Sequence, residues 1–220
     1  RGNGLMMRFG ETKDKRDLIF SKSEFLKSSK ENPYSVNTWY RLGNIHSQLA
    51  QLSKNTRGKN TLLKEGIPYY KRAEELKPSY YEIRYNLGLA YLNLRKPQKA
   101  DKYFKKALKI EPHKLKVLKQ WCEVPYILYS EENKILKEAK ERLKRLKNSI
   151  EINKRGLETL SESSKKKRQP EIDDAQTYYF KQMGYVNYKS KDYGKAMEMY
   201  EKGFRYARDM KNDAEVKVIL

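Results

Sequence analysis

The chain has 220 residues, of which 38% are hydrophobic and 35% charged, and its net charge at neutral pH is +21. Its single cysteine, Cys122, excludes an internal disulfide bond and a zinc site built from cysteines. No stretch is apolar for long enough to span a membrane, and none has the pattern of a signal segment. These limits describe a polar, strongly basic protein that is long enough to bury a core.

The residue types that carry catalysis are sparse and scattered. His46 and His113 are the only histidines, and neither stands in a metal-binding or triad-like context. The sequence has no phosphate-binding glycine loop and no HExxH motif, and its carboxylates are scattered among lysines as ion pairs on helix surfaces. We therefore predict a protein that is not an enzyme and holds no metal or cofactor. Cys122, beside Trp121, is predicted to be a small buried hydrophobe.

Residues 1–35 contain half of a helical pattern. Ser21, Phe25 and Ser28 set an aromatic ring between two small residues at spacings of four and three, which places them on one helix face. Pro33 then stops the helix. This predicts a partial repeat, and because the chain begins with arginine we interpret it as a fragment of something longer.

Residues 36–79 hold a full pair of helices. An aromatic residue, a leucine and a glycine mark the first helix, and an aromatic residue, an alanine and a proline mark the second: Trp39, Leu42, Gly43, Tyr70, Ala73 and Pro78. Eleven more residues separate the two halves than in the pair that follows. We place this surplus in an elongated exposed loop near residues 53–60, a run of Ser, Asn, Gly, Lys and Arg.

Residues 81–114 carry the clearest pattern, with seven marker residues: Leu87, Gly88, Tyr91, Ala100, Phe104, Ala107 and Pro112. Gly88 has no Cβ, so a second helix can approach the first closely. Phe104 lies between two alanines on the facing helix, and Pro112 ends that helix. The spacing resembles the tetratricopeptide repeat, a helix-turn-helix unit of about 34 residues.

The resemblance implies an all-α fold, a right-handed α-solenoid whose concave groove holds a partner. A repeat of this kind is stable only when it is stacked on neighbours. We expect residues 36–114 to form two such repeats and residues 171–220 to form another.

The pattern breaks over residues 115–160. A helix begins with Leu115, Leu118, Trp121 and Cys122, but Pro125 interrupts it. After Ser130, a predicted N-cap, apolar residues fall on a heptad pattern and predict one long non-standard helix: Leu136, Ala139, Leu143, Leu146, Ile150, Leu157 and Leu160. Asn153 interrupts the heptad pattern at a d position, and Gly156 weakens the helix. We favour packing of this seam within the chain; the alternative is a coiled coil with a partner helix or a second copy.

Residues 161–170, with the sequence SESSKKKRQP, are predicted to be a charged linker with little reason to fold. The block Lys165, Lys166, Lys167 and Arg168 has two functional interpretations, a localisation signal or a phosphate contact. We favour a solvated linker over both.

The last predicted repeat has its markers at Phe180, Met183, Gly184, Asp192, Tyr193, Ala196, Tyr200 and Gly203. It has no closing proline, because Arg208 stands where the helix should stop. Residues 212–220 are predicted to begin a further helix.

In the resembling family, the first helix of each repeat lines the groove. Carrying those places over gives a set of candidate partner-binding residues: Asn37, Tyr40, Asn44, Gln48, Glu82, Tyr85, Leu89, Asn93, Lys116, Tyr178, Lys181, Tyr185, Tyr188 and Lys189. Tyrosine suits such a groove because it joins a large ring to a hydroxyl at low entropic cost. We expect the 18 tyrosines to divide about evenly between groove and core.

One binding mode of the family can be compared with the sequence directly. Some tetratricopeptide domains clamp the C-terminal carboxylate of heat-shock chaperones with lysine, asparagine and arginine side chains. Asn44, Asn86 and Lys116 stand at matching places, but Tyr40 replaces a lysine and Gln120 replaces an arginine. The clamp is therefore an alternative rather than our main interpretation.

We predict a scaffold or adaptor, within a multiprotein assembly, that holds a peptide or helix of a partner protein, with lysines steering acidic sequences to the groove. The alternative is a basic surface that binds nucleic acid or an anionic membrane. The even spread of lysines over the helix faces argues against a dedicated nucleic-acid surface. Self-association through the 136–160 helix is a third possibility. The sequence predicts a soluble domain, either cytoplasmic or, if a signal or anchor is missing, periplasmic or membrane-associated.

Overall fold

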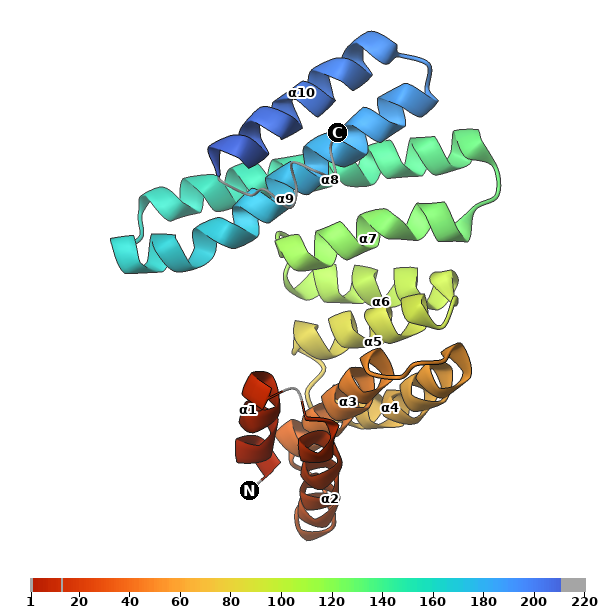
Figure 1. The fold of residues 1–220 in the computed structure, drawn as a ribbon, viewed down its shortest axis with the longest axis vertical. Coiled ribbons are helices and arrows are strands. Elements are labelled where there is room, and N and C mark those ends of the chain that lie inside the picture. The colour runs from red at the N-terminus through yellow and green to blue at the C-terminus, as the bar shows by residue number, and fades with distance from the viewer. Residues whose placement is uncertain (1, 13, 211–220) are drawn as a thin grey trace. The chain divides into compact units, whose positions relative to one another are not determined.

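The computed structural model describes residues 2–12 and 14–210, and every regular element in these ranges is a helix. The helices divide into two compact units, Arg1–Ile110 and Glu111–Leu220. The first unit contains α1 (Gly2–Thr12), α2 (Lys15–Glu31), α3 (Val36–Gln51), α4 (Thr56–Leu76), α5 (Tyr81–Asn93) and α6 (Pro97–Ile110). The second contains α7 (Leu115–Leu128), α8 (Glu132–Glu158), α9 (Glu162–Lys189) and α10 (Tyr193–Asp209) (Figure 1). Among the described residues, no helix is both long enough and apolar enough to cross a membrane.

The first unit is a stack of three helical hairpins, and a close approach of glycine to an aromatic ring recurs in each. A Cβ added to Gly43 would lie 2.5 Å from the Tyr70 ring, and one added to Gly88 would lie 2.6 Å from the Phe104 ring. These glycines therefore allow the two helices of a hairpin to touch, as the sequence predicts. The structure adds a third example, because a Cβ added to Gly2 would lie 2.9 Å from the Phe25 ring. The partial repeat predicted for residues 1–35 thus has a first helix, α1.

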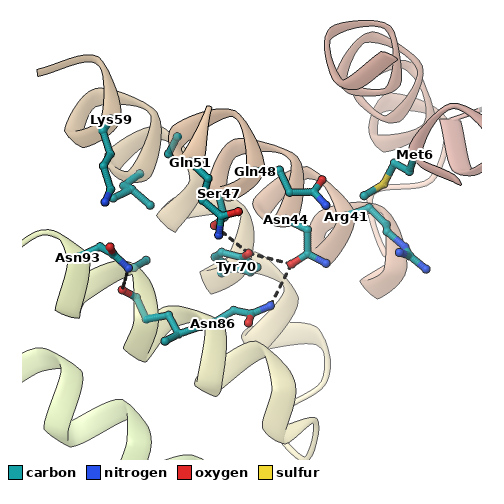
Figure 2. A pocket seen from close by; sticks show the side chains of 14 residues that line it. Met6, Arg41, Asn44, Ser47, Gln48, Gln51, Lys59, Tyr70, Asn86 and Asn93 are labelled. Carbon is teal, nitrogen blue, oxygen red and sulfur yellow. Dashed lines mark hydrogen bonds between the residues drawn. The ribbon is translucent and has the colours of Figure 1, made fainter. Parts of the chain in front are cut away.

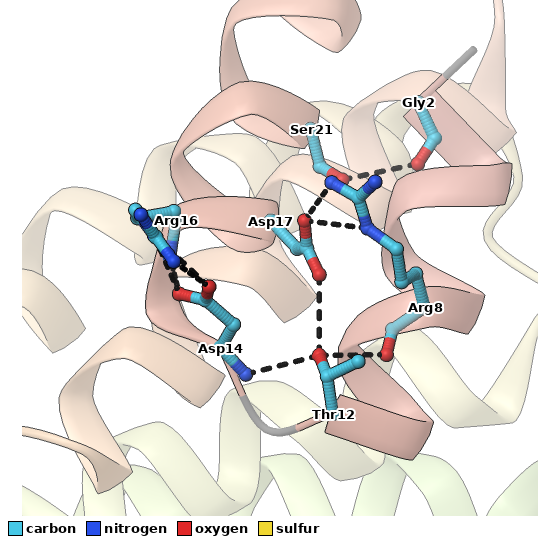
Figure 3. Close-up of polar contacts among 7 residues, drawn as sticks. All are labelled: Gly2, Arg8, Thr12, Asp14, Arg16, Asp17 and Ser21. Carbon is cyan, nitrogen blue, oxygen red and sulfur yellow. Dashed lines mark hydrogen bonds and ion pairs between the residues drawn. The ribbon is translucent and has the colours of Figure 1, made fainter.

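Polar contacts hold α1 against α2 (Figure 3). Arg8 Nε donates to Oδ1 of the buried Asp17 at 2.8 Å, and Ser21 Oγ donates to the Gly2 carbonyl at 3.1 Å. The hydrogen bonds from Arg8 hold the pKa of the Asp17 carboxyl below its usual value. Asp14 caps α2 by accepting from the backbone N–H of Arg16.

The prediction of a long exposed loop near residues 53–60 is wrong. Only residues 52–55 connect the two helices, and the inserted residues lengthen α4 at its start. Asn55 explains the early start, because its side chain accepts from the Gly58 N–H at 2.6 Å and satisfies an N-terminal donor. Leu63 then lies buried within the first turns that follow.

Pro125 does not interrupt α7, contrary to the sequence prediction. Proline lacks the N–H that would bond the carbonyl four residues earlier, which belongs to Trp121. In the structure that carbonyl accepts from Arg142 Nη1 on α8 at 2.8 Å. The Arg142 side chain is buried, and its guanidinium lies 4.4 Å from the centre of the Trp121 ring. The tertiary contact therefore compensates for the missing helical hydrogen bond.

The long helix α8 packs inside the second unit, against α7 and α9. Its heptad residues Leu136, Ala139, Leu143, Leu146, Ile150 and Leu157 are buried. The helix begins one residue later than predicted, with Glu131 rather than Ser130 at the N-cap, and it ends before Leu160. Asn153 donates to the His113 carbonyl at 3.0 Å. The internal packing accounts for the seam without a partner helix.

The prediction of a linker over residues 161–170 is also wrong, because Ser161 is the N-cap of α9 and residues 162–170 form its start. Lysine, arginine and glutamine are good helix formers, and Pro170 lies in an exposed part of the helix. Gln169 donates to Asp173 at 2.6 Å, and Ile172 anchors the helix in the core. A local charge run becomes helical because the chain after it is packed.

The last predicted hairpin is formed by α9 and α10. A Cβ on Gly184 would lie 2.6 Å from the Tyr200 ring, which repeats the glycine and aromatic contact of the first unit. The hairpin turn places Lys191 at φ 62°, as the turn between α5 and α6 places Arg95 at φ 56°. Arg208 lies in the last turn of α10. The further helix predicted for residues 212–220 lies outside the described residues.

Candidate functional site

A polar hollow lies in the first unit, bordered mainly by α3 and α5 (Figure 2). Its volume is about 290 Å³. The lining residues are Met6, Arg41, Asn44, Ser47, Gln48, Ala50, Gln51, Lys59, Leu63, Tyr70, Asn86, Leu89, Ala90 and Asn93. They include two cations, Arg41 and Lys59, and no carboxylate. The hollow therefore suits a polar ligand that is neutral or negatively charged.

A network of hydrogen bonds fixes the floor of the hollow. Asn44 Oδ1 accepts from the Tyr70 hydroxyl at 2.8 Å and from Asn86 Nδ2 at 2.9 Å. The Tyr70 hydroxyl also lies 3.1 Å from Ser47 Oγ. Burial raises the pKa of Tyr70, so this hydroxyl stays protonated and remains a donor. The two amides are consequently held in one orientation before any ligand arrives.

Two polar atoms in the lining have no hydrogen-bond partner among the described residues. They are Nε of Arg41 and Oε1 of Gln48, and both are buried. The residues lie seven positions apart on α3, on the same helix face. Figure 2 shows them at the end of the hollow where Met6 of α1 also lies. An unpaired buried donor and acceptor are costly, so a ligand that pairs with both would gain stability from them.

In the first unit, the sequence-predicted groove residues divide into two groups. Asn44, Gln48, Leu89 and Asn93 line the hollow. The others lie elsewhere: Tyr40 contacts the rings of Tyr70 and Tyr80, Glu82 accepts from the Tyr80 hydroxyl, Tyr85 packs on Phe104, and Asn37 is exposed in the first turn of α3. Tyr85 is thus partly a core residue.

In the second unit, the corresponding helices are α7 and α9, and their side chains contact each other. The Tyr178 hydroxyl donates to Glu123 Oε1, and the rings of Tyr126 and Tyr185 lie 5.9 Å apart. Burial raises the pKa of Tyr178, which keeps this hydroxyl a donor. Lys119 pairs with Asp174 between the same helices.

The remaining candidates of the second unit lie elsewhere on α7 and α9. Lys181 and Lys116 are half-buried, Tyr188 packs edge-on against Tyr193, and Lys189 lies 3.5 Å from Glu132 of α8. The structure therefore brings the first-unit candidates around a hollow, whereas it uses several second-unit candidates for contacts between helices.

The structure brings together only some of the residues compared with the carboxylate clamp. Asn44 and Asn86 are bonded to each other, and Asn86 Nδ2 also lies 3.3 Å from the Tyr40 hydroxyl. Tyr40 supplies no positive charge at the place of the first clamp lysine. Lys116 and Gln120 are half-buried on α7 in the second unit.

The isolated Cys122 and His46 are both buried. Burial raises the pKa of the Cys122 thiol, which keeps it protonated and unreactive. Burial, followed by the charge of Lys22, lowers the pKa of His46, while Glu65 acts in the opposite direction. In the described parts of the chain, no group of three or more His, Cys, Asp or Glu side chains could hold a metal ion.

Sequence analysis missed several lining residues. Arg41 and Ser47 lie beside the family's groove places on α3, and Lys59 and Tyr70 come from the second helix of the pair. Met6 comes from α1, which the sequence did not predict. Asn86 was singled out only through the clamp comparison. The side chains of α4 could not be placed while its first turns were interpreted as a loop.

Comparison with known proteins gives a family match over part of the chain. Residues 81–114 match the family model described as tetratricopeptide repeat. No curated protein matches the chain. The chain thus contains a recognisable tetratricopeptide repeat at the position where its sequence pattern is clearest.

Several solved structures share the fold. MamA matches with a TM-score of 0.65 and 15% identity, over 90% of this chain and 92% of that one. A MamA structure from Desulfovibrio magneticus RS-1 that spans residue 41 to the end matches with a TM-score of 0.64 and 10% identity, over 94% of this chain and 96% of that one. YrrB, described as a TPR protein with an unusual peptide-binding site, gives 0.58 and 16%, over 99% of both chains. At these identities the likeness establishes the fold, an all-α tetratricopeptide solenoid.

Proposed function

We propose that the chain is a non-enzymatic scaffold that holds an extended segment of a partner protein in the hollow of its first unit. The fold supports a protein-protein interaction scaffold in general. YrrB, which shares the fold, is described as having a peptide-binding site. The more specific proposal, a peptide in this hollow, rests on the side chains of the hollow itself.

The observation that carries the proposal is the unpaired couple of Arg41 Nε and Gln48 Oε1. A peptide group offers one carbonyl acceptor and one N–H donor. The carbonyl can accept from Arg41, and the N–H can donate to Gln48. Asn44 and Asn86 form the fixed floor beside this couple, and Asn93 adds an exposed amide farther along α5. A main-chain ligand would match this donor and acceptor once the two buried side chains turn toward it.

The charges of the hollow add a preference to the same proposal. Arg41 and Lys59 lie among the lining residues, and no acidic side chain balances them there. A segment that carries an aspartate or glutamate beside the bound backbone would gain a charge-assisted contact. We expect acidic segments to bind more tightly than neutral ones, with an advantage that shrinks as salt is added.

The test is to select binders from a displayed library of random peptides and to measure the affinity of a selected peptide by fluorescence polarisation. The double variant Gln48→Ala, Asn93→Ala should bind at least about tenfold more weakly, because two ligand hydrogen bonds are lost. Among the residues that the structure describes, neither change removes a tertiary hydrogen bond: Gln48 Oε1 is unpaired there, and Asn93 donates to Leu89 O of its own helix.

Asn37→Ala is the matched control, since Asn37 is exposed on α3 and does not line the hollow. It should bind within about twofold of wild type, as surface changes away from a site usually do. Circular dichroism checks that all variants keep their helical content. A library that yields no enriched peptide, or a peptide that binds the double variant as tightly as wild type, would overturn the proposal.

A further inference from the structure

A second hollow lies in the second unit, between the first turns of α8 and the turn that joins α9 to α10. Its volume is about 590 Å³. The lining residues are Glu132, Asn133, Leu136, Lys137, Lys140, Lys189, Ser190 and Lys191. It involves α8 and the end of α9, so it is separate from the seam where α7 and α9 meet.

The charge of this hollow is strongly one-sided. Four of its lining residues are lysines, and Glu132 is the single carboxylate. Glu132 already lies 3.5 Å from Lys189 Nζ. Lys137, Lys140 and Lys191 are exposed and have no ion-pair partner in the described part of the chain. Three cations therefore face the concave surface, and of these Lys140 also acts on the Asp192 carboxylate, which is paired with Lys195.

The first turns of α8 form one side of this hollow. Its N-cap, Glu131, makes no hydrogen bond from its side chain to the first turn. The open N–H groups of a helix start carry a partial positive charge of about half a unit. Glu132, Asn133 and Leu136 of these first turns line the hollow, and the carboxylate of Glu132 offsets part of the positive charge of the helix start.

Exposed aromatic side chains stand at the same end of the unit. Tyr188 is 53% exposed and Tyr193 is 60% exposed, and their rings meet edge to face at 5.7 Å. Tyr188 directly precedes Lys189, and Tyr193 follows Lys191 by two positions. Large exposed aromatics beside a concave charged surface are typical of protein-binding sites.

We propose that this hollow docks a short acidic segment of a partner protein. Carboxylates of the segment would contact Lys137, Lys140 and Lys191, and an apolar side chain would rest on Tyr188 and Tyr193. The proposal does not depend on the hollow of the first unit, because it uses other residues and another ligand chemistry.

The arrangement favours a protein segment over a nucleic acid. Lys137 and Lys140 are separated by about 4.5 Å along α8, so the basic surface is short. Carboxylates stand close to the lysines in the sequence: Glu131 and Glu132 precede them on α8, and Asp192 directly follows Lys191. A phosphate backbone needs a continuous track of cations, and these carboxylates interrupt such a track. One or two acidic side chains need only the hollow itself.

The test uses a fluorescent peptide of glutamates with one central phenylalanine, titrated against the full chain at physiological salt. The double variant Lys137→Glu, Lys140→Glu should bind at least about tenfold more weakly, because two attractions become repulsions. The control is Lys166→Glu, Lys167→Glu, which changes the net charge equally. These lysines are exposed, have no ion-pair partner among the described residues, and lie about 33 Å from Lys189 along α9. The control should bind within about twofold of wild type.

A second pair of measurements tests the aromatic part. Tyr188→Ala, Tyr193→Ala should weaken the phenylalanine peptide by at least about threefold and leave a peptide with alanine at that position unchanged. If both charge reversals weaken binding equally, diffuse charge explains it and the proposal fails. It also fails if the peptide does not bind while single-stranded DNA or phosphatidylserine vesicles bind in a way that depends on Lys137 and Lys140.

Discussion

Between α3 and α5 of the first unit, short amide side chains leave a hollow of about 290 Å³. Between α7 and α9 of the second unit, tyrosines and an ion pair occupy the space, with Tyr178 bonded to Glu123 and Tyr126 against Tyr185. In each case the two facing helices are joined through the helix between them in the chain, α4 in the first unit and α8 in the second. The comparison shows that the repeat architecture does not by itself produce an open groove. The side chains that face each other differ: Asn44 and Asn86 in the first unit, Tyr178 and Glu123 in the second.

The largest expected difference in stability between the two units follows removal of an aromatic ring that packs on a helix glycine. These rings are Phe104 on Gly88 and Tyr200 on Gly184. Phe104 is fully buried, whereas Tyr200 is half-buried. Phe104→Ala should therefore destabilise the first unit by about 3–5 kcal/mol. Tyr200→Ala should cost clearly less, because part of its ring is already in water. Hydrogen exchange followed by mass spectrometry would assign each loss to its unit, and equal losses would contradict the burial argument.

The contact between α7 and α9 in the second unit can be weakened by removing one hydroxyl group. Tyr178→Phe removes the donor to Glu123 and leaves a half-buried carboxylate with one partner fewer, at a cost of about 1–3 kcal/mol.

The counterpart in the first unit is Tyr70→Phe, which should cost about 1 kcal/mol, because Asn44 Oδ1 still accepts from Asn86. Urea denaturation of both variants measures the difference. A larger loss for Tyr70→Phe would mean that the floor of the hollow is more important to stability than the seam.

The two units should also respond differently to mild acid. The pKa of His46 is lowered by burial, so the unfolded chain takes up a proton below pH 6.5 while the folded chain does not. The first unit should then be at full stability above pH 6.5 and lose stability as the pH falls below it. Lys22 and Glu65 are the charged groups that face the ring.

His46→Phe should flatten this pH dependence, because it removes the group whose pKa differs between the folded and unfolded chain. Thermal unfolding between pH 5 and 7.5 is the measurement. If the unfolding temperature of the His46 variant falls with pH as steeply as that of the wild type, another group causes the pH dependence.

The smallest expected effect concerns the hairpin turns that both units share. Arg95 and Lys191 adopt positive φ, a conformation that costs residues other than glycine about 1 kcal/mol. Arg95→Gly and Lys191→Gly should each stabilise their own unit by less than about 1 kcal/mol, since glycine also loses more entropy on folding. Chemical denaturation would detect the shift, and a destabilised variant would mean that the side chain makes a stabilising contact.

What the sequence determined is local. The repeat over residues 81–114, the close contact of Gly88 with Phe104 and the buried heptad positions of α8 all follow from spacings of a few residues along a helix. Such spacings fix which side chains share a face, so all-α architecture and much of the core could be predicted. Candidate groove residues on α3 could be placed for the same reason.

The tertiary structure decided what depends on residues far apart in the sequence. Pro125 stays inside α7 because Arg142 of α8 bonds the carbonyl that proline leaves free. Residues 162–170 become helical because Ile172 and the rest of α9 are packed. Whether a groove is open depends on facing side chains of two helices, such as Asn44 with Asn86 or Tyr178 with Glu123. These contacts form only after the helices have assembled, so no pattern within one helix could reveal them.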